Sequence, residues 1–179
     1  MMFHLTVETP GHGHVQAFLA ATGAQQPSHA GRWISELGRL NQVLTLREVV
    51  TIPISPALPV TYPVQHRETR LLGTIKAYRP SADQLFELRE YAIVPGQLQA
   101  FIGLMQDALP VRERHSLNSG VWVPLSGDPD RVLHLWSYRD FAHRDEARSG
   151  AMREPLWREY LEAIAPLLGD MHSTILRPA

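Results

Sequence analysis

The chain has 179 residues, of which 44% are hydrophobic and 20% are charged, and its net charge is −1. This composition is typical of a globular protein and excludes a disordered chain, which would have fewer apolar residues and a larger charge imbalance. The nearly neutral charge provides no electrostatic footprint for nucleic acid or for an anionic membrane surface. The sequence contains no cysteine, which excludes disulfides, thiolate catalysis and cysteine-ligated metals.

The amino-terminal segment reaches Glu8 before a long apolar run develops, so it does not read as a secretory signal. No later segment approaches the roughly 18 apolar residues of a membrane span. His12 and His14 stand close together, but no carboxylate or cysteine supports them at ligand spacing. We therefore expect no membrane association, no nucleic-acid partner, no metal, no cofactor and a cytoplasmic location.

The first half of the chain is expected to form a strand, a helix, two strands, a variable segment and a last strand. The variable segment, 52–64, contains four prolines. Because proline in a helix interior costs roughly 3 kcal/mol, a regular helix is excluded there. The segment is interpreted as an extended loop: a lid over a cavity, an arm across a partner, or a surface loop that replaces a lost helix.

The second half is expected to form the same series with a longer helical part. Strands are predicted at about 85–94, 119–126, 131–138 and 171–177, and helices at about 96–109, 140–150 and 155–168. The turn-rich segment 126–130 is typical of a hairpin between the second and third strands.

Internal similarity indicates that the second half repeats the first. The segment 15–20 (VQAFLA) corresponds to 98–103 (LQAFIG), an offset of 83 residues, and a Pro-Gly turn signal lies near both. Farther along, 31–34 (GRWI) corresponds to 120–123 (GVWV) at an offset of 89. We predict two domains, a degenerate repeat at 1–80 and a better preserved repeat at 84–179.

Two strand motifs of the second repeat carry a resemblance to a known family. They are Glu-x-Arg-x-Tyr at 87–91 and His-x-Trp-x-Tyr at 134–138, and Pro95-Gly96 lies between them. With these motifs, residues 84–178 resemble the NIPSNAP family. The resemblance implies an α+β fold: tandem ferredoxin-like repeats with antiparallel sheets that form a dimeric α/β-barrel. Relatives in that superfamily include cofactor-free monooxygenases, haem-degrading oxygenases, lactone isomerases and polyketide cyclases.

Alternation along two strands predicts one functional face, because successive side chains point to opposite sides of a sheet. Six polar or aromatic residues share this face: Glu87, Arg89, Tyr91, His134, Trp136 and Tyr138. The alternating apolar residues are expected to pack beneath the helices: Phe86, Leu88, Leu133 and Leu135. The functional face is too apolar for an open surface and too polar for a plain core, so we expect it to line the barrel interior.

Three residues of this face are candidate catalytic residues: Glu87, Arg89 and His134. A buried carboxylate and guanidinium can screen each other, whereas either alone would be costly. Arg89 is suited to clamp an anionic group or to stabilise an oxyanion. His134 is suited to act as a general base, because imidazole titrates near neutral pH. Hydrogen bonding or stacking to a planar ligand is expected from the aromatic residues Tyr91, Tyr138, Trp122 and Trp136.

The first repeat is expected to complete the cavity from the other side with His4, Thr6 and Arg47. Together these residues predict a protein that binds a small, planar or anionic molecule in the barrel cavity. Cofactor-free chemistry of the monooxygenase, isomerase or cyclase type is compatible with them. Arg144 and Arg148, beside acidic neighbours, are interpreted as part of a solvated helix face laced with ion pairs.

Two alternatives remain open at this point. The aromatic face can be the subunit interface of a non-enzymatic adaptor or assembly module, because Tyr, Trp and Arg commonly anchor protein contacts. A haem-degrading variant is the other alternative. The barrel can close within one chain or between two chains, and we predict a homodimer.

Overall fold

The structure is a computed structural model that describes residues 1–23, 30–49 and 63–179. Its strands are β1 (Met2–Pro10), β2 (Gly31–Leu37), β3 (Val43–Val49), β4 (Val64–Lys76), β5 (Leu85–Ile93), β6 (Asn118–Pro124), β7 (Arg131–Tyr138) and β8 (Leu168–Pro178). Its helices are α1 (Val15–Gly23), α2 (Leu98–Arg112), α3 (Phe141–Ala151), α4 (Pro155–Ile164) and the short 3-10 helix η1 (Ala165–Leu167).

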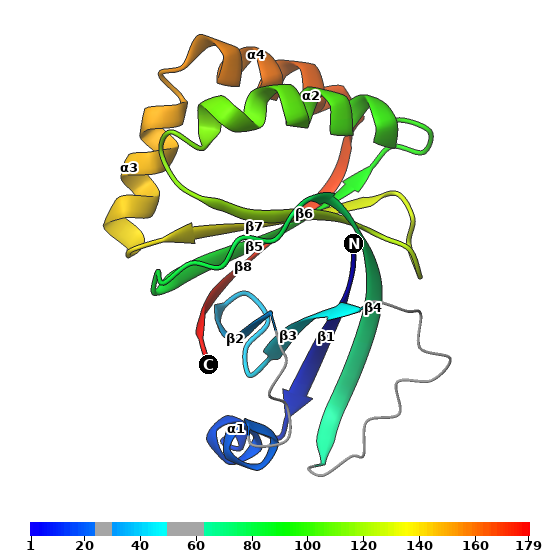
Figure 1. Cartoon of the computed structure of the whole chain (residues 1–179), viewed down its shortest axis with the longest axis vertical. Coiled ribbons are helices and arrows are strands. Elements are labelled where there is room, and N and C mark those ends of the chain that lie inside the picture. Colours follow the sequence, from blue (N-terminus) through cyan, green and yellow to red (C-terminus); the bar gives the residue numbers. More distant parts are fainter. Residues whose placement is uncertain (24–29, 50–62) are drawn as a thin grey trace.

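The strands form one closed barrel in the order β1-β3-β2-β8-β5-β7-β6-β4. Each neighbouring pair is antiparallel, and pairing of β1 with β4 closes the ring. The strands of the first half lie on one side of the barrel and those of the second half on the other (Figure 1). One chain therefore supplies both sheets, and closure needs no partner chain. The homodimer stays a prediction.

The two halves share strand order and register. Leu5 pairs with Leu46 between β1 and β3, and Leu88 pairs with Leu135 between β5 and β7. These pairs are related by the offsets of 83 and 89 found in the sequence. The α+β fold with an antiparallel sheet is thus as expected, while the tandem repeat and the domain boundaries at 80 and 84 stay predictions.

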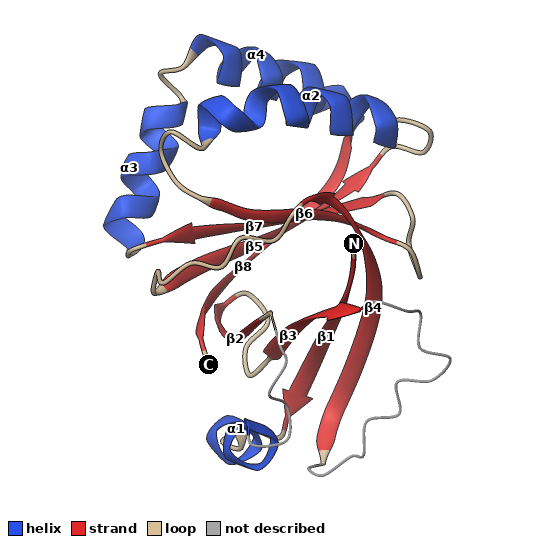
Figure 2. Ribbon diagram, in the orientation of Figure 1, coloured by secondary structure: helices blue, strands red, loops and turns tan. Residues whose placement is uncertain are grey.

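Helices cover the outer faces of the barrel unequally (Figure 2). Helices α2, α3 and α4 lie over the sheet of the second half, and the short α1 lies over that of the first half. Helix α3 begins at a capping residue, because the side chain of Asp140 accepts a hydrogen bond from the backbone N–H of His143 at 2.7 Å. Helix α4 begins with Pro155, which is tolerated in a first turn.

The barrel interior is an apolar core to which both halves contribute. Its buried residues are Phe3, Leu5, Val7, Trp33, Leu44, Leu46, Leu72, Phe86, Leu88, Trp122, Leu133, Leu135 and Leu176. A cavity of only about 20 Å³ lies among them. An eight-stranded barrel has an interior just wide enough for side chains to fill, and this one is filled.

Glycine allows the two interior tryptophans to fold back over their own strands. A Cβ at Gly31 would lie 2.1 Å from the ring of Trp33, and a Cβ at Gly120 would lie 2.4 Å from the ring of Trp122. Tyr78, between β4 and β5, packs edge-on or tilted against both rings at centroid distances of 6.5 and 6.4 Å. The rings of Trp33, Tyr78 and Trp122 therefore fill this part of the barrel interior.

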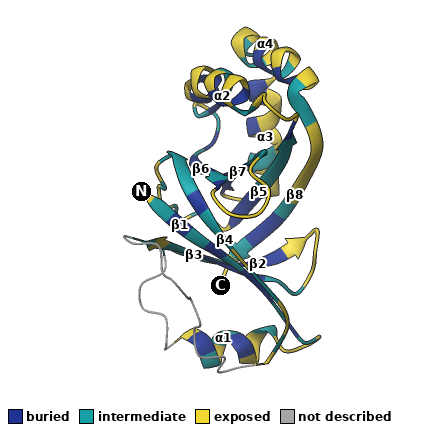
Figure 3. Ribbon diagram, turned by 90° about the vertical axis from the view of Figure 1, so that its right-hand side faces the viewer, coloured by how far each residue is buried: buried dark blue, intermediate teal, exposed yellow. Residues whose placement is uncertain are grey.

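The predicted direction of the two sheet faces is wrong. Phe86, Leu88, Leu133 and Leu135 belong to the barrel interior, whereas Trp136 and Tyr138 pack with residues of α2 and α4. Buried residues lie on both faces of β5 and β7, and Figure 3 shows buried positions along the strands beneath the helices. Alternation therefore separated the two sets correctly but carried no information about which set turned inward.

The predicted loop at 52–64 lies outside the described residues except for its last two positions, and β4 begins at Val64. Among the helices that the structure describes, none has the length and hydropathy needed to cross a membrane.

Candidate functional site

The six residues of the predicted functional face do come together, between the sheet and the helices. Arg89 Nε lies 3.1 Å from Glu87 Oε1, and Arg89 Nη1 donates to Tyr91 Oη at 3.2 Å. The rings of Tyr91 and His134 are 4.7 Å apart between centroids. Strand pairing places Arg89 directly opposite His134 and Glu87 directly opposite Trp136. The cluster is thus continuous, although it lies on the opposite side of the barrel wall from the predicted cavity.

Glu87 is the centre of this cluster and is fully buried. Arg144 of α3 holds its carboxylate in two places, with Nε 2.9 Å from Oε2 and Nη2 3.0 Å from Oε1. Ser173 Oγ donates to Oε1 at 2.6 Å, and Tyr138 Oη lies 3.4 Å from Oε2. Such charge-assisted contacts are shorter and stronger than neutral hydrogen bonds. They tie α3 and β8 to the middle of β5.

The surroundings of Glu87 keep it ionised. Burial alone would raise the pKa of this carboxyl group, but the hydrogen bonds from Arg144 and the charge of Arg89 outweigh it and lower the pKa to about 2. A carboxylate with so low a pKa cannot exchange protons near neutral pH. Glu87 is therefore suited to hold cations in place and not to act as a general base.

His134 is also held in one protonation state. Trp136 Nε1 donates to its Nδ1 at 2.8 Å, and because an indole nitrogen is only a donor, Nδ1 must be the acceptor. Burial, followed by the charge of Arg89, lowers the pKa of His134 to about 3. The ring is thus neutral at physiological pH, with its proton on Nε2, and is not poised as a general base.

Three arginines that the sequence did not predict as site residues complete the cluster. Arg112 of α2 lies over the ring of Trp136 at 4.6 Å and donates to Tyr138 Oη at 3.4 Å. Arg148 Nη1 lies 4.0 Å from Glu87 Oε1. Arg144 and Arg148 were assigned to a solvated face, but their spacing of four residues puts both on one side of α3, and that side faces Glu87. We call Arg89, Arg112, Arg144 and Arg148 the guanidinium cluster.

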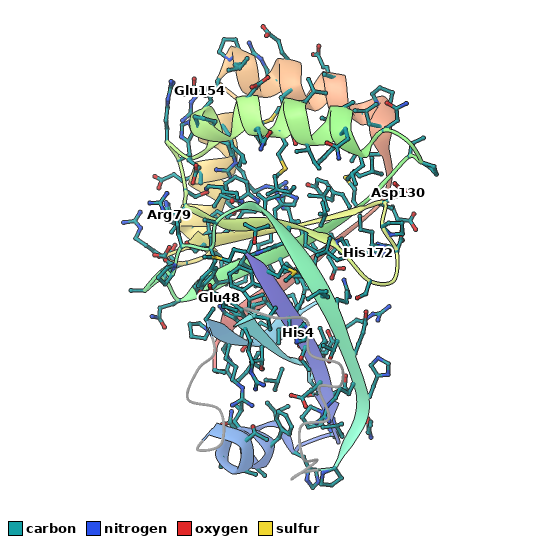
Figure 4. The ribbon with its side chains drawn as sticks, turned by 45° about the vertical axis from the view of Figure 1, so that its right-hand side comes forward. His4, Glu48, Arg79, Asp130, Glu154 and His172 are labelled. Atoms are coloured by element: carbon teal, nitrogen blue, oxygen red, sulfur yellow. The ribbon has the colours of Figure 1, made fainter. Side chains whose placement is uncertain are left out.

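The other predicted ligand-binding residues lie elsewhere. Trp122 is in the barrel core, where the adjoining cavity has room for about one water molecule and not for a planar ligand. His4, Thr6 and Arg47 alternate with barrel-facing residues and therefore lie on the outer face of the first sheet. Figure 4 labels His4 on that sheet. These residues do not complete a shared cavity with the six.

A large cavity opens at one end of the barrel, which we call the barrel mouth. It has a volume of about 810 Å³, and its apolar floor includes Val7, Leu44 and Leu88. Polar residues of both halves line its walls, among them Glu68, Arg70, Glu90, His172 and Thr174. In Figure 4, His172 lies toward this end of the barrel and Arg79 toward the other.

An ion pair crosses the barrel mouth. Arg70 of β4 places Nη1 2.5 Å from Glu90 Oε2 on β5, and its Nε lies 2.6 Å from Glu68 Oε1. Strands β4 and β5 are not neighbours in the barrel, so this contact joins the two sheets across the opening. His172 pairs with Glu90 across β5 and β8, which turns both side chains to the same face.

The charges of the barrel mouth balance. Three arginines, Arg39, Arg70 and Arg131, line it together with three carboxylates, Glu68, Glu90 and Asp128. None of these residues was predicted as a site residue. The signal was present in the alternation of β5, where Glu90 follows Leu88 on the face that was expected to pack under helices.

Comparison with the sequences of known proteins points to one family. The NIPSNAP family profile matches residues 86–179, more than half of the chain. A NipSnap homolog of Dictyostelium discoideum is 23% identical over 182 residues, covering 92% of this chain and 82% of that protein. For several animal relatives, by contrast, the chain spans only about a third of their length.

Solved structures give the same result. A NIPSNAP domain protein from Burkholderia xenovorans is 31% identical to this chain and superposes with a TM-score of 0.51. The alignment covers 53% of this chain and 94% of the Burkholderia chain. A structure from Lactobacillus acidophilus, described as a candidate monooxygenase, covers 98% of this chain and 92% of its own with a TM-score of 0.69. Its identity of 10% shows a shared fold alone. By the match over residues 86–179, the chain belongs to the NIPSNAP family.

Proposed function

We propose that the protein binds a small molecule in the barrel mouth, one with an apolar, planar part and a hydrogen-bonding polar group. The observation that carries this proposal is the cavity of about 810 Å³ with an apolar floor and polar walls. Pockets for small ligands typically measure 300–1,000 Å³ and combine apolar lining with a few convergent polar groups. Because the barrel beneath is filled, the ligand rests on Leu44 and Leu88 and does not enter deeper.

The charge balance of the mouth favours a ligand without net charge. Arg70 already has two carboxylate partners, Glu68 and Glu90, so an added anion would have to displace one of them. Thr174 and Ser126 offer neutral hydroxyl groups at the same opening. The predicted preference for an anion therefore does not belong to this cavity.

The experiment is a fluorescence titration with N-phenyl-1-naphthylamine, a neutral aromatic dye that brightens in apolar surroundings. Thr174→Phe introduces a ring at the mouth and should weaken dye binding about tenfold or more. The matched control is Gln99→Phe, which adds the same side chain to an exposed position of α2. Equal dye affinities in both variants, or no saturable binding to the wild-type protein, would refute the proposal.

A reaction at this site is a narrower proposal. His172 lines the mouth beside Glu90 and can accept a proton from a bound ligand, as a cofactor-free oxygenase, isomerase or cyclase requires. Oxygen uptake with an anthrone would test the oxygenase version, which a fold neighbour described as anthrone oxidase-like suggests. His172→Gln should then abolish turnover while leaving dye binding intact, and turnover that survives the change would exclude this role.

The adaptor alternative loses its main support. It required the aromatic sheet face as a subunit contact, but Trp136 and Tyr138 are 2% and 0% exposed and are covered by the helices of the same chain.

A further inference from the structure

The guanidinium cluster carries more positive charge than its acidic partners neutralise. Three arginines of the cluster contact Glu87, and the fourth, Arg112, contacts Tyr138 beside it. The one further acid in ion-pair contact with the cluster among the described residues is Asp145, 3.6 Å from Arg144. Asp145 is 78% exposed, so solvent screens its charge. Four guanidinium groups against two carboxylates leave a formal charge of +2. This surplus contrasts with the balanced charges of the barrel mouth.

The surplus is both sheltered and reachable. The side chains of Arg89 and Arg144 are each 20% exposed, and that of Arg148 is 47% exposed. Arg89 uses Nε and Nη1 in hydrogen bonds, and Arg144 uses Nε and Nη2. Among the described residues, Nη2 of Arg89 has no hydrogen-bond acceptor, Nη1 of Arg144 has only the exposed Asp145 at 3.6 Å, and Arg148 reaches no acceptor closer than Glu87 at 4.0 Å. Three forked donors thus converge with unused capacity around one carboxylate.

A second, independent observation points to a missing acceptor. His134 is 4% exposed, and its Nε2 has no hydrogen-bond partner within the part of the chain that the structure describes. Since Trp136 fixes the proton on Nε2, the unpartnered atom is a donor. A buried donor without an acceptor costs free energy, so His134 adds an unsatisfied donor on the same sheet face as Arg89. His134 lies directly across from Arg89 on the same sheet face.

We propose that the guanidinium cluster binds a small oxyanion, a carboxylate or a phosphate group, between α3 and the second sheet. Planar guanidinium groups match both anions in a bidentate fashion. The oxyanion would take the unused nitrogens of Arg144 and Arg148 from the solvent side, while Glu87 keeps the arginines in position. The site is separate from the barrel mouth and does not depend on the function proposed there.

The test uses the full chain and two anions, inorganic phosphate and acetate, each titrated at constant ionic strength against chloride. Isothermal calorimetry gives the affinity, and the indole N–H resonance of Trp136, which touches both His134 and Arg112, reports binding at the site. We expect saturable binding and a shift of that resonance. Tighter binding of phosphate favours a phosphorylated ligand, and acetate that binds at least as tightly as the more highly charged phosphate favours a carboxylate.

Two matched variants decide the outcome. Arg148→Gln should lower the affinity for the more tightly bound anion about tenfold, which corresponds to about 1.4 kcal/mol of binding free energy. Arg158→Gln removes the same charge from an exposed position of α4 and should leave the affinity unchanged. The proposal is overturned if neither anion binds the folded wild-type protein saturably, or if both variants weaken binding equally. Phosphate should not displace dye from the barrel mouth, so the two sites succeed or fail separately.

Discussion

The buried, neutral state of His134 makes the stability of the protein depend on pH. The folded-state pKa of His134 is about 3, against 6.5 for an ordinary histidine. Between these two values the unfolded chain binds a proton that the folded protein excludes. The stabilisation is therefore fully present above pH 6.5 and is lost as the pH falls toward 3. Over the 1.5 pH units from 6.5 to 5, the loss is about 2 kcal/mol at 1.36 kcal/mol per unit.

Urea unfolding followed by tryptophan fluorescence at pH 7.5 and at pH 5 measures this loss. The matched variant is His134→Asn, whose amide oxygen can accept from Trp136 Nε1 in place of Nδ1 but does not titrate. The variant should be less stable at pH 7.5, because it loses the packing of the ring. Between pH 7.5 and 5, however, the wild-type protein should lose about 2 kcal/mol more than the variant.

Between pH 7.5 and pH 5, Glu87 contributes little to the change in stability. An ordinary glutamate has a pKa of 4.5, and the pKa of Glu87 is about 2, so this carboxylate is ionised in both the folded and the unfolded chain above pH 5. Parallel stability curves for the two proteins would mean that His134 is hydrated or protonated in the folded state. The neutral Nε2 donor, and with it one support for the oxyanion site, would then be wrong.

Gly120→Ala should destabilise the fold by about 1–3 kcal/mol in urea unfolding, because the new Cβ would lie 2.4 Å from the ring of Trp122. The control is Gly103→Ala on α2, where a new Cβ would meet nothing within 4 Å; its stability should be unchanged or higher by up to about 1 kcal/mol. Comparable losses in both would contradict the close approach. Glu87→Gln should lower the free energy of unfolding by about 3 kcal/mol at pH 7. The difference in unfolding free energy between variant and wild type should shrink as the pH falls from 4.5 toward 2, measured by acid titration of the folded state. A difference that does not change with pH would argue against an ionised carboxylate. Arg70→Gln should cost about 2 kcal/mol by thermal unfolding, between the values typical of exposed and buried pairs, because Arg70 and Glu90 are only 19% and 20% exposed. A loss below about 1 kcal/mol would show that the bridge does not hold the two sheets together.

The fold was largely predictable because it rests on local patterns that the chain repeats. The offsets of 83 and 89 residues mark equivalent positions, and the registers of β1 with β3 and of β5 with β7 keep them in place. Alternation and turn residues predicted the strand β7 at the observed 131–138 and the hairpin before it. Nothing local specified which strands of one half would meet the other, so closure within the chain had to come from the structure.

The candidate site was predictable as a set of neighbours but not as a place. Period-two alternation put Glu87, Arg89 and Tyr91 on one face of β5, and the structure brings them into contact. The pattern could not say whether that face met helices or the barrel interior, since both environments bury it. Arg144 and Arg148 were missed for a related reason: an arginine that pairs with a buried carboxylate has the same local sequence as one that meets solvent.

Strand β5 has no single functional face. Its odd-numbered positions place Glu87 and Arg89 under the helices, where positive charge is in surplus, and its even-numbered positions place Leu88 and Glu90 in the barrel mouth, where charge is balanced. A charged ligand and an apolar one are thus favoured on opposite sides of the same strand, one residue apart in sequence. The two alternating sets of residues on β5 thus support two separate proposed binding sites with different chemistry.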